Sequence, residues 1–172
     1  ILKKIGNKCK NIDVNLKEMM KTSLKDIKNV WPKKLSSGII HGDLFVDNIF
    51  FKNNKFHGYI DFYFSSNDFF MYEIAICINA LCFDKKKGKF IFNKKKSRNL
   101  LKGYSSIIKL SKYEKKSLNV LCKGAALRYL LTRTYDYLYT PKSAIIKIKD
   151  PREYIEKLKF HSKSNSFKNY FN

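Results

Sequence analysis

Three polar side chains in the middle of the chain have the types and the spacing that phosphoryl transfer needs. Asp43 and Asn48 lie in the segment HGDLFVDN (residues 41–48), and Asp61 follows 13 residues after Asn48. Mg²⁺ prefers oxygen ligands and is held by one or two carboxylates together with substrate phosphates. Phosphoryl transfer needs such a metal and a further carboxylate that orients the attacking hydroxyl and accepts its proton. The spacing therefore predicts a phosphotransferase site.

An Asp- and Asn-rich turn between two strands is the structural alternative for the same residues, because both types favour turns. That alternative does not explain why an acid, Asp61, interrupts an apolar strand at this place. For His41, which precedes Asp43 by two residues, we expect a structural role in orienting the loop backbone rather than a role as base or ligand.

The elements around these residues alternate between helices and a small β arrangement. Apolar spacing predicts a helix over residues 13–28, ended by Trp31-Pro32. Strands are expected at 38–40, 49–51 and 56–60, with a turn at 53–55. A helix at 69–81 is apolar on nearly every face and should be buried. The centre of the chain is thus a β element that carries the acids.

The second half of the sequence predicts a loose hairpin at 84–92 and two long helices at 93–108 and 111–139. Ser111 and Glu114 form a capping-box pattern at the start of the second of these helices. Asp150, Pro151 and Glu153 form a start signal for a last helix that reaches about residue 161, with Glu153 completing a second capping box. The tail after Ser162 is expected to be frayed.

Four segments resemble a known family. HGDLFVDN, with the preceding Ile40, is similar to the catalytic loop of the aminoglycoside phosphotransferase and choline kinase group, which shares the protein-kinase-like fold. The other three segments resemble the homoserine kinases of this group: IDFYFSSND (60–68), GAALRYLLTR (124–133) and KDPREY (149–154). The resemblance covers about residues 31–160.

The resemblance implies roles for individual residues. Asp43 would be the catalytic base or hydroxyl-orienting group, and Asn48 and Asp61 would hold Mg²⁺ against the phosphates of ATP. In the wider family an Asp on the following helix, within a Tyr-Asp-Leu-Ala pattern, ties down the catalytic loop. Glu73 stands at that place here and is one methylene longer, so we expect the interaction to be kept with altered detail.

The substrate that the resemblance implies, L-homoserine, carries an ammonium, a carboxylate and the hydroxyl to be phosphorylated. Arg128 and Arg133 are two of only four arginines, and the planar guanidinium suits a carboxylate. Ion pairs to Asp136 or Glu73 are the structural alternative for both. Asp68 is a candidate partner for the ammonium, with loop capping as its alternative.

The predicted fold class is α+β: the mostly helical C-terminal lobe of the protein-kinase-like fold, with a small β-hairpin element that carries the catalytic and metal residues. Residues 1–30 are expected to form a helix and a connection to a small nucleotide lobe that this chain lacks. Residues 31–163 form the catalytic and substrate-binding lobe, and 164–172 the tail. The expected product is O-phospho-L-homoserine, on the way to threonine.

Charge and composition narrow the possible partners and functions of the chain. The chain has 172 residues and a formal net charge of +22, but the cations are almost all lysine, and residues 38–82 carry five acids and two lysines. We therefore expect neither a nucleic acid nor a membrane partner. Four cysteines without CxxC spacing predict free thiols in the reducing cytoplasm. A kinase for choline, ethanolamine or an aminoglycoside, and a non-catalytic basic module that binds RNA or anionic membrane, are the alternative functions.

Overall fold

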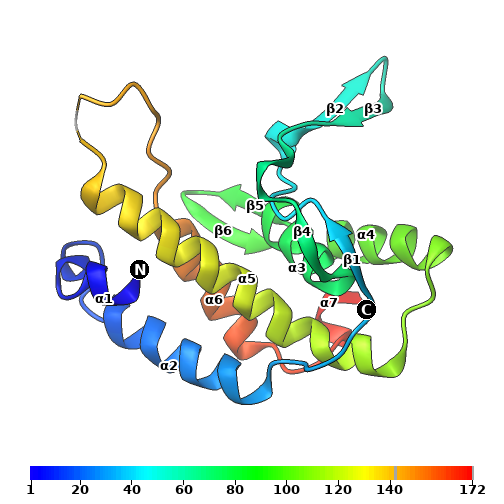
Figure 1. Ribbon diagram of the computed structural model, residues 1–172, viewed down its shortest axis with the longest axis horizontal. Coiled ribbons are helices and arrows are strands. Elements are labelled where there is room, and N and C mark those ends of the chain that lie inside the picture. Colours follow the sequence, from blue (N-terminus) through cyan, green and yellow to red (C-terminus); the bar gives the residue numbers. More distant parts are fainter. Residues whose placement is uncertain (142, 172) are drawn as a thin grey trace.

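A computed structural model describes residues 1–141 and 143–171. It is an α+β structure in which helices form the body and three two-stranded antiparallel sheets lie at its periphery (Figure 1). The elements, in chain order, are α1 (Leu2–Ile5), η1 (Lys8–Asn11), α2 (Leu16–Val30), β1 (Ser37–Ile40), η2 (Val46–Asn48), β2 (Ile49–Lys52), β3 (Lys55–Tyr59), η3 (Phe62–Phe64), β4 (Ser66–Phe69), α3 (Phe70–Leu81), β5 (Phe83–Lys86), β6 (Lys89–Phe92), α4 (Lys94–Ile107), α5 (Lys112–Tyr139), α6 (Arg152–Lys163) and α7 (Lys168–Phe171).

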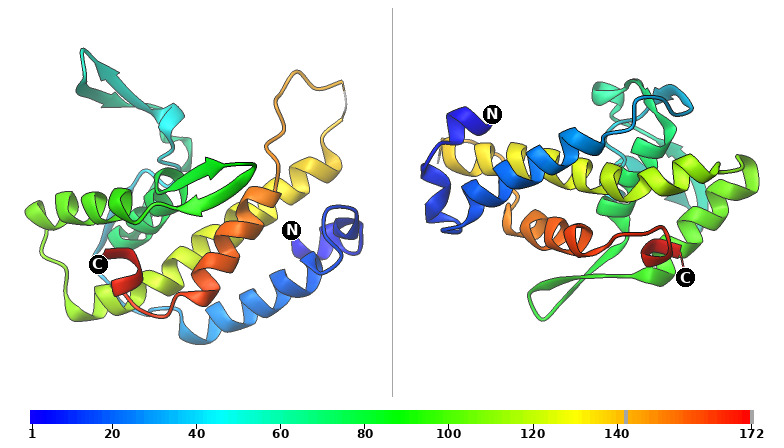
Figure 2. Two further views of the ribbon diagram at one scale, coloured as in Figure 1. Left: turned by 180° about the vertical axis from the view of Figure 1, so that it is seen from behind. Right: turned by 90° about the horizontal axis from the view of Figure 1, so that it is seen from below.

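The long helix α5 is the centre of the core, and α2, α3 and α6 pack around it (Figure 2). Most faces of α3 are buried, as its apolar sequence predicts. Trp31, at the end of α2, lies against Gly124 of α5, where a Cβ atom would stand 2.4 Å from the indole ring. This close approach explains why the helix carries a glycine in its interior. Among the described residues, no helix is long and apolar enough to cross a membrane.

The two predicted capping boxes have different outcomes. The one at α5 is confirmed: the Ser111 hydroxyl accepts from the Glu114 amide, and Glu114 accepts from the Ser111 amide at 2.8 Å. At α6, Asp150 accepts a hydrogen bond from the Arg152 amide at 2.9 Å, but Glu153 does not complete the box. The Glu153 carboxylate instead binds the buried cations Arg133 and Lys157, because these interactions are stronger than a bond to an exposed amide.

The β elements form as predicted, with one addition. The β2–β3 hairpin turns through Asn53 and Asn54, which adopt positive φ angles of 51° and 60°. The hairpin predicted near residues 84–92 is present as β5 and β6. Strand β4 was not expected, because its sequence, SNDF, is polar; it pairs with β1 so that Gly38 lies opposite Asp68. Tertiary pairing, rather than local propensity, makes this segment a strand.

The described part of the C-terminal tail, residues 164–171, packs against the core, although the sequence predicts a frayed tail. It forms α7, whose Tyr170 is fully buried. The Tyr170 hydroxyl lies 2.9 Å from Nδ1 of His161 and accepts a bond from Asn119 at 2.9 Å. Tyr170, together with Phe167 and Phe171, which pack against the core, thus anchors a segment whose composition suggests disorder.

The hydrogen bonds around His161 determine its tautomer. The amide nitrogen of Asn79 donates to the carbonyls of Ala75 and Cys122, so its oxygen must accept from Nε2 of His161, 3.1 Å away. Nδ1 is then the acceptor for Tyr170. The imidazole is neutral, and burial, together with the charges of Lys157 and Lys123, lowers its pKa to about 3.

All four cysteines of the chain are buried free thiols, as predicted.

This lowered pKa predicts acid sensitivity of the fold. The unfolded chain binds a proton at His161 below about pH 6.5 whereas the folded chain does not, so stability is complete above that pH and decreases as the pH falls toward 3. Urea unfolding should show about 2 kcal/mol less stability from this group at pH 5.0 than at pH 7.5. His161→Gln should lose this dependence, while His57→Gln, at an exposed histidine, should keep it. An unchanged pH dependence in His161→Gln would contradict the prediction.

Candidate active site

The loop between β1 and β2 carries Asp43, and its backbone is held from two sides. The Gly42 amide donates to the Glu73 carboxylate at 2.9 Å, and the Gly42 carbonyl accepts from the Arg128 guanidinium at 2.9 Å. Gly42 has a φ angle of 76°, and a Cβ atom here would lie 2.5 Å from the carbonyl oxygen of Phe64. Only glycine satisfies both the backbone angle and this close approach. The loop conformation is therefore set by α3 and α5 together.

His41 connects this loop to the end of the β2–β3 hairpin. Its Nδ1 accepts from the Asp43 amide at 3.3 Å, so Nε2 carries the proton and donates to the Ile60 carbonyl at 2.8 Å. Both ring nitrogens are thus used in bonds to the backbone. The side chain joins the residue before Asp61 to the amide of Asp43 and has neither nitrogen free for a ligand.

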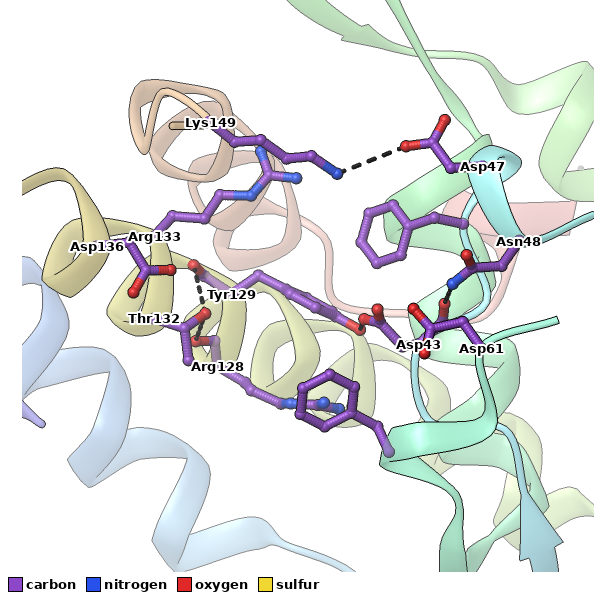
Figure 3. A pocket seen from close by; sticks show the side chains of 12 residues that line it. Asp43, Asp47, Asn48, Asp61, Arg128, Tyr129, Thr132, Arg133, Asp136 and Lys149 are labelled. Carbon is purple, nitrogen blue, oxygen red and sulfur yellow. Dashed lines mark hydrogen bonds and ion pairs between the residues drawn. The ribbon is translucent and has the colours of Figure 1, made fainter. Parts of the chain in front are cut away.

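Asn48 and Asp61 come together because the β2–β3 pairing continues beyond the strands. The Ile60 amide donates to the Asn48 carbonyl at 3.2 Å. The Asn48 side-chain amide donates to the Asp43 carbonyl at 2.9 Å. Asp43, Asn48 and Asp61 line one cavity of about 450 Å³ (Figure 3). The three residues that the sequence singled out are therefore neighbours in space.

The donor set at Asn48 and Asp61 fits a Mg²⁺ ion. Because the nitrogen of the Asn48 amide is used by Asp43, its oxygen is left for a ligand. The Asp61 carboxylate accepts no hydrogen bond from the described residues, and Asp61 has the left-handed backbone angles 62° and 59°, which are unfavourable for a non-glycine residue and are typical of functional sites. No cluster of three or more His, Cys, Asp or Glu side chains arranged for a metal occurs in the described chain. Two oxygen ligands suit Mg²⁺, which takes its other ligands from phosphates and water.

Tyr129 of α5 makes a contact with Asp43 that could not be predicted from the sequence. Its hydroxyl donates to Oδ1 of Asp43 at 2.9 Å, across 86 residues of chain. A tyrosine within a long apolar helix pattern is more often a core residue, and nothing in its spacing indicates which loop it faces. Only the packing of α5 against the loop reveals the bond.

The predicted substrate residues lie in different surroundings. Arg128 and Arg133 line the cavity, but each already binds a protein group: Arg128 the Gly42 carbonyl, and Arg133 the Glu153 carboxylate at 2.5 Å. The carboxylate that pairs with Arg133 is thus Glu153, not Asp136 or Glu73. Asp68 does not line the cavity; it lies on β4, where its Oδ1 accepts from the Phe69 amide at 2.7 Å.

A buried ion cluster lies beneath Arg133. Lys157 is 2% exposed, donates to the Asn79 carbonyl at 2.6 Å and pairs with Glu153, which also binds Arg133. Burial by itself raises the pKa of the Glu153 carboxyl, but the charges and hydrogen bonds of Lys157 and Arg133 bring it below its ordinary value. Glu153 therefore stays ionised and holds α5 and α6 together.

The chain is similar to phosphotransferases in its first half and to homoserine kinases over most of its length. Residues 7–88 match the phosphotransferase enzyme family. Over a longer span the chain is similar to homoserine kinases. It is 45% identical over 150 residues to "Homoserine kinase" of Rhizobium meliloti (strain 1021), which is 87% of this chain and 45% of that protein.

Two further relatives carry the same name. The chain is 47% identical over 146 residues to the homoserine kinase of Sinorhizobium fredii, covering 85% of this chain and 44% of that protein. It is 42% identical over 170 residues to the homoserine kinase of Acidiphilium cryptum, which is 99% of this chain and 52% of that protein. The chain thus spans about half the length of the curated relatives it matches.

Proposed function

We propose that this chain is the catalytic lobe of an ATP-dependent kinase that phosphorylates the side-chain hydroxyl of L-homoserine, giving O-phospho-L-homoserine for threonine synthesis. The observation that supports this most directly is the convergence of Asp43, Asn48 and Asp61 on one cavity in a chain 42–47% identical to homoserine kinases. Asn48 and Asp61 meet the requirement for metal ligands, and Asp43 meets that for a carboxylate that orients the hydroxyl.

In the proposed reaction the substrate hydroxyl lies beside the Asp43 carboxylate. The hydroxyl oxygen forms a bond to the γ-phosphorus of ATP while the bond from that phosphorus to the β–γ bridging oxygen breaks. Asp43 accepts the hydroxyl proton, and the products are the phosphate ester and ADP. Mg²⁺ held by Asn48 and Asp61 would neutralise the charge of the phosphates. His41, Glu73 and Arg128 keep the loop in place through its backbone.

The substrate's charged groups have candidate partners in the same cavity. A guanidinium has five N–H donors, and among the described residues Arg128 and Arg133 each use one nitrogen. Their remaining donors can bind a carboxylate. Asp136 also lines the cavity and has no ion-pair partner in the described chain, so it is a better placed partner for the ammonium than Asp68.

The aromatic residues of the cavity favour an amino acid over choline. A quaternary ammonium is bound by the open faces of aromatic rings. Here the Arg128 guanidinium lies 5.6 Å from the centre of the Phe64 ring and 5.0 Å from that of Tyr129, and the Lys149 ammonium lies 5.4 Å from that of Phe45. Protein cations thus occupy the rings that a choline cage would need.

The test is an assay of the complete polypeptide encoded by the gene, because phosphate positioning supplies most of the catalysis in this class and the chain spans half of its relatives. ADP release is measured with L-homoserine, choline, ethanolamine and an aminoglycoside at equal concentrations. We expect homoserine to be turned over most efficiently. Absence of turnover with homoserine, or faster turnover of choline, would contradict the proposed substrate.

A further inference from the structure

We propose that Tyr129 is a positioning residue for the catalytic carboxylate, whose Oδ1 it binds so that Oδ2 faces the substrate hydroxyl. The inference rests on the proposed function, since it assigns Asp43 the task of orienting a hydroxyl. The Tyr129 hydroxyl lies 2.9 Å from Oδ1 of Asp43 and 3.3 Å from the Gly42 carbonyl (Figure 3). The single hydroxyl proton goes to the carboxylate, because that oxygen is nearer and charged, whereas the Gly42 carbonyl already accepts from Arg128.

The Tyr129 ring is held on several sides, so its hydroxyl has a fixed position. The side chain is 7% exposed. Phe45, from the same loop as Asp43, meets the ring edge-on at 5.1 Å between centroids, and Tyr154 of α6 packs against it at 5.3 Å. The Arg128 guanidinium lies 5.0 Å from the ring centroid. A donor that cannot move is the kind of support a catalytic group needs.

The other bonds around Asp43 hold its backbone and leave its carboxylate free. His41 binds the Asp43 amide, and Asn48 binds the Asp43 carbonyl. Within the part of the chain that the structure describes, Tyr129 is the only side chain that donates to the carboxylate. Burial raises the pKa of Tyr129 well above its usual range, which keeps the hydroxyl protonated as a donor. Without it, the carboxylate would rotate away from the hydroxyl for part of the time.

The expected effect is on turnover rather than on binding. Misplacing a catalytic group reduces the fraction of bound substrate in a reactive geometry and leaves contacts to the rest of the substrate intact. In the complete polypeptide, Tyr129→Phe should lower kcat about tenfold, with KM for homoserine and for ATP within about twofold of the unsubstituted enzyme. Tyr135→Phe is the matched control, because Tyr135 lies on the same helix, packs against Tyr139 and does not line the cavity; its kcat should be unchanged.

A double-mutant cycle separates positioning from general damage to the fold. In an Asp43→Asn background, where the carboxylate is already absent, adding Tyr129→Phe should cost no further activity. A further tenfold loss there, an unchanged kcat in Tyr129→Phe alone, or a rise in KM at constant kcat would overturn the inference. If homoserine itself is not a substrate, the proposed substrate is wrong, and the same variants are compared on the acceptor that does release ADP.

Discussion

Replacing Asp43 by Asn is expected to lower the turnover of homoserine by the complete polypeptide about 10³-fold. The amide keeps the size and one oxygen of the carboxylate but cannot accept the hydroxyl proton as the bond to phosphorus forms. The loop should remain in place, because Gly42 and His41 hold it through backbone bonds. The measurement is kcat from ADP release, with KM for ATP determined in the same assay.

Asp47→Asn provides the matched control for this variant. Asp47 lies four residues away on the same loop, lines the same cavity and makes an ion pair with Lys149 at 3.7 Å between exposed side chains. Exposed pairs contribute little, so its removal should change kcat less than about threefold. Equal losses in both variants would show that the loop responds to charge in general, and full activity in Asp43→Asn would show that Asp43 is not the base.

The helices could be predicted from sequence where local signals and tertiary packing agree. The apolar run of α3 predicts that helix and nearly its bounds, and the capping box of α5 predicts where that helix begins. Strand β4 and helix α7 could not be predicted, because their polar sequences gain their structure from tertiary partners. Strand β4 pairs with β1, and α7 is held through the contact of Tyr170 with His161. Local composition carries no information about such partners.

The same distinction applies to the site. That Asp43, Asn48 and Asp61 come together could be predicted, because the β2–β3 hairpin lies between Asn48 and Asp61 and returns the chain to the loop that carries Asp43. The contact of Tyr129 with Asp43 and the pairing of Arg133 with Glu153 depend on how α5 and α6 pack. For Arg133 the rarity of arginine predicts a need for a guanidinium, but it could not identify the carboxylate that Arg133 binds in the structure.

Glu153→Gln should destabilise the fold by about 3 kcal/mol, the cost of leaving a buried charge without its partner. Lys157 is 2% exposed and cannot regain water without disrupting the packing of α3 and α6, and Arg133 loses its ion pair in the same substitution. Glutamine keeps the shape and one oxygen, so the loss reports on charge rather than on a cavity. Urea unfolding at pH 7.5 measures the effect as a lowered transition midpoint.

Asp47→Asn is the control, since it removes the carboxylate of an exposed pair with Lys149, 3.7 Å away. Its midpoint should stay close to that of the unsubstituted chain, because both groups remain hydrated. The buried pair also predicts a pH dependence: the lowered pKa of Glu153 means that its stabilisation is complete above the ordinary pKa of glutamate and is lost as the pH falls through the folded value. Glu153→Gln should therefore show a smaller loss of stability on acidification than the unsubstituted chain, and an equal loss in the two would contradict the ionised cluster.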